Sequence, residues 1–328
     1  MRTLVVSGYG VRLRVRRRCL VVEEGGERMV VPLAEIDRIV VVTSGVSITS
    51  SAVRALARYG VDIVFLDPHG TPMISLCPPW ISASVETRLA QYRARLDPSL
   101  RLAYAKAFAQ AKVLNQAHFL QELYLKTKAS WLVEEAEKLQ RLAAEIMLAD
   151  KVSRVRSLEG VAAKIYWGAI ASLLPPSLGF PGRDQDSADP VNTSLNYLYG
   201  LLYTWSFKAL AIHGLDPYTG FLHEDRAGNP VLVFDYVEMF RVSAVDKLVY
   251  KLVIEGFRPE VDPGTGLLTR ETRAKLVEEF ARWMRRKARD GSGQAESLEK
   301  HVMLYARRLA RALRSQQPYY GFVEAVIA

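Results

Sequence analysis

Four side chains between residues 159 and 238 have the types and spacing of a site for a divalent metal ion. They are Glu159, His223, Asp235 and Glu238. Carboxylate oxygens suit hard ions such as Mg²⁺, and a single imidazole shifts the preference towards Mn²⁺ without excluding either ion. The chain carries a formal net charge of +9, which attracts nucleic acid. A Mg²⁺ or Mn²⁺ site in such a chain indicates phosphate chemistry.

Glu159 falls on a predicted helix, residues 158–174, with an apolar stripe that is expected to pack inward. The stripe consists of Leu158, Val161, Ala162, Ile165, Ala169 and Leu173. Glu159 lies beside this stripe, on a face shared with Ala163 and Tyr166, which leaves room for a ligand. The alternative is a glutamate placed near a helix N-terminus, where the helix dipole favours it and no other role is needed.

The carboxylates of Asp235 and Glu238 belong to a second predicted helix, which begins at about Pro230. Residues three apart meet on one face of a helix. Two carboxylates among apolar neighbours repel each other, and a divalent cation removes that repulsion. The alternative is that one carboxylate faces solvent while the other pairs with Arg241.

His223 is the histidine best placed for chemistry, because it emerges from the Gly- and Pro-rich turn at residues 214–220. His69 and His118 are expected to be structural or solvent-facing, and His213 is a weaker candidate. Several other chemistries lack their motifs. There is no G-x-x-x-x-G-K-[ST] loop for nucleotide hydrolysis, no G-x-S-x-G elbow for a nucleophilic serine, and no Cys- or His-paired spacing for structural zinc.

Two groups of basic residues are candidates for contact with DNA. One is a predicted strand on which arginines alternate with apolar residues, so that one face is basic. The other lies near the end of a predicted helix, residues 272–289, where helix-dipole effects and simple solvation also favour basic side chains. The members are Arg12, Arg14 and Arg16 on the strand and Arg282, Arg285 and Arg286 on the helix.

The elements that must position these residues change in type along the 328-residue chain. The first 80 residues contain short apolar runs separated by turns, with one helix at about residues 50–59 closed by Gly60. The apolar runs lie at residues 4–6, 20–22, 29–33, 39–42 and 63–66. After residues 77–80 the chain becomes helical, with periodic apolar residues over 100–125 and 131–148.

We therefore predict an α+β fold in which a small β domain at residues 1–82 is followed by a linker at 83–96. An all-α catalytic domain with a basic C-terminal tail then occupies 97–328. Two interruptions are expected in that domain. Residues 175–190 should form a mobile, functional loop, and residues 290–297 should form a linker before a final basic helix at 298–313.

The sequence has no apolar run long enough to span a bilayer and no pattern of a secretory signal. Its two cysteines, Cys19 and Cys77, provide no disulfide framework, so reduced thiols in a cytoplasm are expected.

Five segments, taken in order, resemble the CRISPR-associated integrase family, Cas1. They are residues 36–70, 88–116, 158–170, 189–203, and the pair GLDPYTGFLH at 214–223 with FDYVEMFR at 234–241. The last pair is the most specific. The sequence departs from the family pattern at Val242, where a proline usually follows FR, which leaves the bend after Arg241 open. The segment after Gly291 matches no motif.

The resemblance implies a β-sandwich-like N-terminal domain that mediates a homodimer and an α-helical catalytic domain. It implies that Glu159, His223 and Asp235 bind Mg²⁺ or Mn²⁺, with Glu238 in support. The activity it implies is insertion of short DNA fragments into a CRISPR array by attack of a 3′-hydroxyl, in the cytoplasm of a prokaryote. The implied partners are double-stranded and branched DNA and the small Cas2 protein.

Three other functions are consistent with the same residues. A transposon-borne integrase of this fold would insert long DNA ends. A branched-DNA repair nuclease would cut without joining. A non-catalytic DNA-binding scaffold would bind DNA equally well with or without a divalent metal ion.

Overall fold

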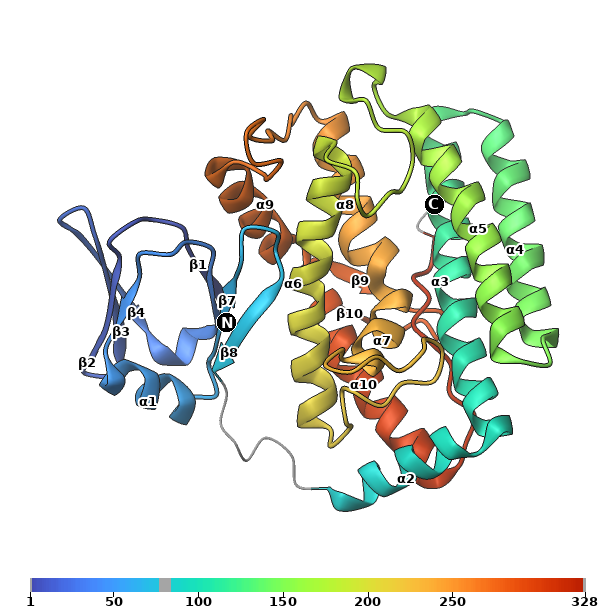
Figure 1. Cartoon of the computed structure of the whole chain (residues 1–328), viewed down its shortest axis with the longest axis horizontal. Coiled ribbons are helices and arrows are strands. Elements are labelled where there is room, and N and C mark those ends of the chain that lie inside the picture. Colours follow the sequence, from blue (N-terminus) through green and yellow to red (C-terminus); the bar gives the residue numbers. More distant parts are fainter. Residues whose placement is uncertain (1, 77–83, 327–328) are drawn as a thin grey trace.

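The computed structural model describes residues 2–76 and 84–326 (Figure 1). Cys77, one of the two expected free thiols, lies outside the described residues. The described chain comprises an N-terminal part made of strands and a larger helical part, which confirms the predicted α+β class. None of the described helices combines the length and the apolarity that crossing a bilayer requires.

Two four-stranded sheets make up the N-terminal part. The first has the order β1 (Arg2–Val6), β5 (Ile36–Val41), β7 (Asp62–Leu66), β8 (Pro72–Leu76). The second has the order β4 (Glu27–Pro32), β3 (Cys19–Glu24), β2 (Arg12–Arg16), β6 (Ser47–Ile48). Leu13, Leu20, Ile39 and Ile63 are buried in one core between the sheets. The expected sandwich-like domain is therefore present.

The predicted apolar runs each became a strand because their neighbours supply turns. The helix expected at 50–59 is α1 (Ser50–Arg58), capped at its start by the Thr49 side chain and followed by Gly60 at φ +69°. On β2 the arginines are exposed while Leu13 is buried, as the alternation predicted. Strand β8, which carries Pro72, was not predicted.

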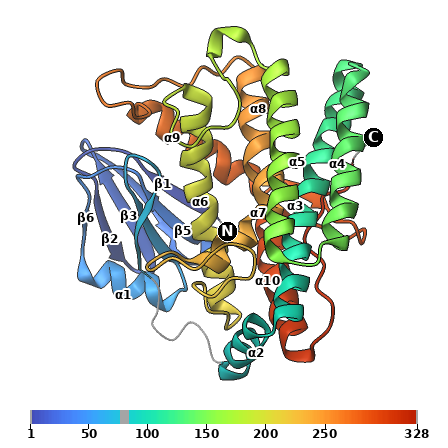
Figure 2. The same cartoon turned by 45° about the vertical axis from the view of Figure 1, so that its right-hand side comes forward.

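Long helices form the rest of the chain. They are α2 (Val85–Leu96), α3 (Pro98–Thr127), α4 (Trp131–Leu148), α5 (Val152–Leu173), α6 (Pro190–Ile212), α7 (Val231–Arg241), α8 (Lys247–Ile254), α9 (Arg270–Trp283) and α10 (Leu298–Ser315). In Figures 1 and 2, α6 lies between the N-terminal sheets and the group formed by α3, α4 and α5. The segment 83–96, expected as the interdomain linker, contains α2, which packs against α10.

Two expectations for the C-terminal third are wrong. The helix predicted at 272–289 ends at Trp283, and the predicted linker at 290–297 is part of a hairpin formed by β9 (Lys287–Arg289) and β10 (Ala295–Ser297). The hairpin forms because Asp290 accepts hydrogen bonds from the backbone of Ser292 and Gln294, while Gly293 adopts φ +87°. The loop at 175–190 is tied to α6, since Arg183 donates hydrogen bonds to Asn192 and Asn196.

The N-terminal sheet and α6 are joined by buried charges. Arg38 on β5 contacts Asp62 on β7 at 2.6 Å between Nε and Oδ2, and its guanidinium lies 3.7 Å from the ring centre of Trp205 on α6. Lys208 on α6 pairs with the same aspartate. These contacts link strands β5 and β7 to α6.

A close approach between two glycines belongs to the same junction and gives a first testable prediction. A Cβ added at Gly200 on α6 would lie 2.0 Å from the carbonyl oxygen of Gly70, in the turn between β7 and β8. We expect Gly200→Ala to reduce the free energy of unfolding by about 1–3 kcal/mol, because backbone must shift to admit the methyl group. Urea denaturation followed by circular dichroism measures this change.

The matched control is Gly160→Ala on α5, where an added Cβ meets nothing within 4 Å. That helical substitution should stabilise the protein by about 0.5–1 kcal/mol. Equal effects of the two substitutions would show that the contact between α6 and the β7–β8 turn is not tight in solution.

Candidate active site

The turn before α7 is built around the carboxylate of Asp235. This side chain is fully buried, and its oxygens accept hydrogen bonds from the backbone N–H groups of Phe221, Leu222 and His223. A Cβ at Gly220 would lie 2.7 Å from Asp235 Oδ2, so the chain can pass this close only with glycine there. The carboxylate of Asp235 therefore joins the GLDPYTGFLH segment to the first turns of α7.

His223 is oriented by the same carboxylate. Its Nδ1 lies 2.6 Å from Asp235 Oδ1, which leaves Nε2 as the ring nitrogen available to a ligand. Burial lowers the pKa of His223, but the hydrogen bond with Asp235 and the charges of Glu238 and Glu159 outweigh it, so the pKa is raised above its usual value.

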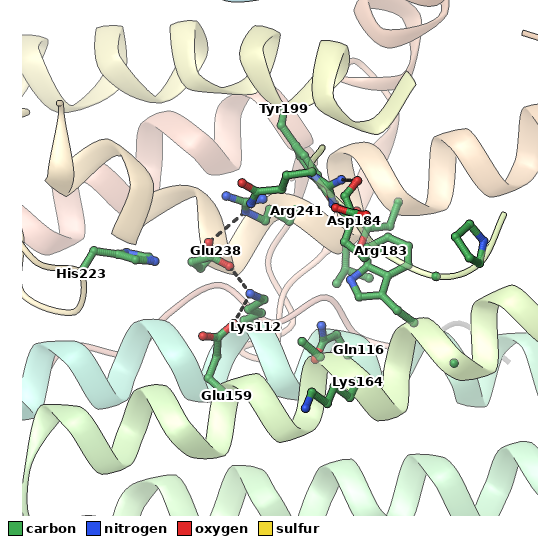
Figure 3. A pocket seen from close by; sticks show the side chains of 18 residues that line it. Lys112, Gln116, Glu159, Lys164, Arg183, Asp184, Tyr199, His223, Glu238 and Arg241 are labelled. Atoms are coloured by element: carbon green, nitrogen blue, oxygen red, sulfur yellow. Dashed lines mark hydrogen bonds and ion pairs between the residues drawn. The ribbon is translucent and has the colours of Figure 1, made fainter. Parts of the chain in front are cut away.

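His223, Glu159 and Glu238 line one cavity of about 700 Å³. Figure 3 shows Glu159 rising from α5, Glu238 projecting from α7, and His223 approaching Glu238 from the turn. Asp235 is not among the residues that line the cavity. The structure thus brings three of the four predicted residues to one space and places the fourth behind His223.

A lysine from α3 stands between the two cavity carboxylates. Lys112 Nζ is ion-paired with Glu159 Oε1 and lies 2.6 Å from Glu238 Oε2 (Figure 3). The other oxygen of Glu238 lies 3.0 Å from Arg241 Nε. Burial raises the pKa of Glu238, but Arg241 and Lys112 lower it further, so the pKa lies well below its usual value and the group is ionised.

The donor set fits a hard divalent ion. Two carboxylates and an imidazole whose other nitrogen is held by a carboxylate form a common arrangement around Mg²⁺ or Mn²⁺. The carboxylates already hold a cation, the ammonium group of Lys112. Among the described residues, no three or more His, Cys, Asp and Glu side chains stand close enough to hold an ion as they are now arranged. To hold a metal ion, the carboxylates and the imidazole would have to draw closer together and Lys112 would have to move from between the carboxylates.

The far wall of the cavity carries a second polar group. Asp246, in the π-helical turn Val242–Asp246 that follows α7, accepts hydrogen bonds from the hydroxyls of Tyr166 at 3.0 Å and Tyr199 at 2.6 Å. The guanidinium of Arg241 lies 4.4 Å from the ring centre of Tyr199. The π-helical turn takes the place of the bend that the missing proline left open, and such turns often occur at functional sites.

Two expectations about the ligand helices are wrong. Helix α5 begins at Val152, six residues before the predicted start, so Glu159 lies inside the helix and the helix N-terminus does not explain it. Val161, expected on the inward stripe, is 48% exposed. Tyr166, expected beside the ligand, is instead fully buried, and Trp167 lines the cavity. The alternative for Asp235 and Glu238 is half right, because Glu238 pairs with Arg241 but neither carboxylate faces solvent.

Several cavity residues were missed in the sequence. They are Lys112, Gln116, Lys164, Arg183 and Asp246. Lys112 had a visible signal, since it interrupts the apolar run around Phe108, Ala111 and Val113 in the middle of the helix, where most side chains are buried. Arg183 comes from the loop predicted to be functional, and nothing in that loop's composition indicated which element it would contact.

The six candidate arginines do not gather at this cavity. Arg12, Arg14 and Arg16 lie on the exposed face of β2, at the far side of the molecule from α5 in Figure 1. Arg286 is used within the fold, because it pairs with Glu324 and donates to Ser243 O. Arg282 pairs with Glu279 on the surface of α9.

Comparison with known proteins places this arrangement in a family. Residues 4–282 match the family model described as CRISPR associated protein Cas1. The chain belongs to the Cas1 family. A CRISPR-associated endonuclease Cas1 of Pyrobaculum aerophilum is 41% identical over 280 residues, covering 84% of this chain and 89% of its own length. One of Saccharolobus solfataricus is 33% identical over 326 residues, 98% of each chain.

Solved structures show the same fold. A casposase bound to its integration product matches with a TM-score of 0.84 and 26% identity, covering 100% of this chain and 95% of its own. A Cas1 protein from Thermotoga maritima matches with a TM-score of 0.80 and 20% identity, covering 97% and 99%. The resemblance read from the sequence is confirmed. This Cas1-family chain is an enzyme of the endonuclease and integrase type.

Proposed function

We propose that this protein joins the 3′-hydroxyl end of a short DNA fragment to a phosphodiester of a CRISPR array, with Mg²⁺ or Mn²⁺ as cofactor. The observation that carries the proposal is the convergence of Glu159, Glu238 and His223 on one cavity. The basic charge of the chain, its CRISPR-associated relatives and its likeness to a casposase solved with an integration product support it.

The proposed ligand set differs in one member from the set that the sequence suggested. Both oxygens of Asp235 are occupied by backbone N–H groups and by His223, and the side chain is fully buried. Glu238 instead lines the cavity, and its Oε2 lies 2.6 Å from Lys112 Nζ. We therefore assign Glu159, His223 and Glu238 as ligands, and Asp235 as the residue that positions His223.

In the proposed reaction each side chain has a separate task. A bound divalent ion supplies Lewis-acid activation of the phosphodiester. Asp235 keeps His223 Nε2 directed at the cavity, and Arg241 fixes one oxygen of Glu238. Lys164 and Arg183 add positive charge to the cavity wall, where a phosphate backbone would pass.

The bonds exchange one for one. The attacking 3′-hydroxyl loses its proton, and its oxygen forms a bond to phosphorus as the bond from phosphorus to the recipient strand's 3′-oxygen breaks. The leaving oxygen takes a proton and becomes a new 3′-hydroxyl. Water as the attacking group gives cleavage at the same site. An alternative task for His223 is to pass that proton to the leaving oxygen rather than to bind the metal ion.

The proposed partners follow from the family. We propose that residues 1–82, the N-terminal sandwich domain, mediate a homodimer, and that the small Cas2 protein and double-stranded and branched DNA bind the complex. Two of the similar solved structures are Cas6-RT-Cas1–Cas2 complexes, one of them partial. The proposed site of action is the cytoplasm of a prokaryotic cell.

The deciding experiment is joining of a short duplex to a supercoiled target plasmid by the wild-type protein. Joined product should form with Mn²⁺ or Mg²⁺ and disappear when EDTA is added, because the carboxylates then hold Lys112 and not a metal ion. Equal joining with and without EDTA would refute the metal-dependent mechanism. DNA binding with neither joining nor cleavage under any metal would indicate the non-catalytic scaffold.

A second candidate function, integration of transposon ends, is favoured by the match to a casposase over the whole chain. The relatives at 41% and 33% identity are CRISPR-associated endonucleases, which favours the CRISPR role. The two functions differ in the DNA that is inserted. Comparing joining of short duplexes with joining of long terminal sequences in the same assay distinguishes them.

A further inference from the structure

Lys112 stands where the proposed function places the metal ion, and the inference drawn from this position rests on that function. The two carboxylate oxygens nearest its ammonium group, Glu159 Oε1 and Glu238 Oε2, belong to the groups assigned to the metal ion. The lysine side chain is 13% exposed and the Glu238 side chain 4%, so water screens these charges only weakly. One space cannot hold both an ammonium group and a divalent ion.

A second acceptor stands one helical turn away. Gln116 lies four residues after Lys112 on α3, and both line the cavity (Figure 3). Helical side chains lean towards the N-terminus, so the Gln116 amide leans towards Lys112. Its Oε1 is buried and has no hydrogen-bond partner in the described part of the chain. A buried acceptor without a partner is costly, and a nearby ammonium group would satisfy it.

We propose that Lys112 is an exchangeable counter-ion of the site. Its ammonium group holds Glu159 and Glu238 together in the metal-free protein and turns to Gln116 Oε1 when a divalent ion takes its place. The flexible four-carbon stem of lysine permits this movement without a change in the backbone of α3. Lys112 thereby keeps two buried carboxylates from repelling each other, and it lowers the apparent affinity for the metal ion.

Lys112→Met tests the exchange. We expect this variant to bind Mn²⁺ at least about tenfold more tightly than wild type in isothermal titration of the full chain without DNA. If Lys112 occupies the site for about nine-tenths of the time, the apparent affinity of the site for Mn²⁺ is about tenfold lower than that of an open site. The metal-free variant should also be less stable than wild type, and Mn²⁺ should raise its melting temperature more.

The matched control is Lys164→Met, which removes the same charge from the same cavity. Lys164 lines the cavity and has no ion-pair partner in the described part of the chain. Its substitution should change Mn²⁺ affinity by less than about threefold, since the ligand carboxylates stay paired with Lys112. If both substitutions tighten Mn²⁺ binding equally, the change in net charge explains the effect and the exchange is wrong.

Two further variants keep the proposal testable if Lys112→Met does not fold. Lys112→Arg retains a cation that can bind carboxylates through two donors, so it should weaken Mn²⁺ binding relative to wild type. Gln116→Leu removes the second acceptor, so it should weaken Mn²⁺ binding when Lys112 is present and have no effect together with Lys112→Met.

The outcomes separate the two proposals. If neither wild type nor Lys112→Met binds Mn²⁺, the assigned metal site is wrong. If both bind Mn²⁺ with the same dissociation constant, the metal site stands and the exchange is wrong. Tighter binding by Lys112→Met with unchanged binding by Gln116→Leu would overturn Gln116 as the second acceptor.

Discussion

Glu238→Gln is expected to lower the rate of strand joining by on the order of 10²–10³-fold, the usual loss when one preorganised electrostatic group is removed from an active site. The substitution keeps the shape of the side chain and removes its charge. One oxygen of Glu238 lies against Lys112 at the assigned metal site and the other lies 3.0 Å from Arg241, so the metal site and its support weaken together. Single-turnover joining with Mn²⁺ measures the rate.

The comparison with Asp235→Asn decides which carboxylate is the ligand. Asp235 acts on His223 from behind, so its substitution should weaken Mn²⁺ binding by about 10–100-fold, as losses of such supporting groups do. Saturating Mn²⁺ should then restore part of the joining rate in Asp235→Asn and little in Glu238→Gln. If high Mn²⁺ instead rescues Glu238→Gln and not Asp235→Asn, the roles of the two carboxylates are reversed.

Glu324→Gln is expected to reduce the free energy of unfolding by about 3–5 kcal/mol, the cost of removing one partner from a buried ion pair. The Glu324 side chain is 4% exposed and contacts Lys247 at 3.1 Å and Arg286. His118 and Asn115 on α3 bind the backbone of the same residue. The substitution therefore leaves Arg286 without a carboxylate partner and Lys247 with Glu122 alone, where the C-terminal segment crosses α3. Urea denaturation at pH 7 measures the loss.

The pH dependence of this effect has a defined sign. Burial raises the pKa of Glu324, but Arg286 and Lys247 lower it further, to about 2, from 4.5. Since the folded pKa lies below the unfolded one, the stabilisation is complete above about pH 4.5 and is lost as the pH falls towards 2. The difference in stability between wild type and Glu324→Gln should shrink over that interval.

The control is Glu255→Gln, which breaks an exposed pair with Lys251 one helical turn away. An exposed pair of this kind contributes about 0.5 kcal/mol at most. A loss for Glu324→Gln no larger than for Glu255→Gln would mean that the C-terminal segment is not anchored on α3 in solution.

The sequence indicated the first of these two regions, around Glu238, but not the second, around Glu324. The GLDPYTGFLH and FDYVEMFR segments named His223, Asp235 and Glu238 directly, because a turn rich in Gly and Pro and a three-residue spacing on a helix are local patterns. The segment around Glu324 carried no motif, and its contacts come from α3, α8 and the residues after α9.

Errors in the helix boundaries have a similar cause. Helix α4 was predicted at its observed bounds because its apolar period is regular. Helix α5 was predicted too short, since residues 152–157 carry only two apolar side chains, Val155, which is fully buried, and Val152, which is partly buried against the core. Helix α9 was predicted too long, because the basic residues after Trp283 fit a helix end as well as they fit the strand that forms there.

The amino-acid sequence by itself determined the α+β class, most of the strands and long helices, the basic charge, and three residue types suited to Mg²⁺ or Mn²⁺. The tertiary structure decided that Glu159, Glu238 and His223 share one cavity with Lys112, and that Asp235 lies buried behind His223. It also decided that Arg286 is used within the fold. The physical reason is that periodicity and turn chemistry act over a few residues. Which carboxylate faces a cavity and which is buried under backbone N–H groups depends instead on helices more than a hundred residues apart in the chain, such as α3 and α7.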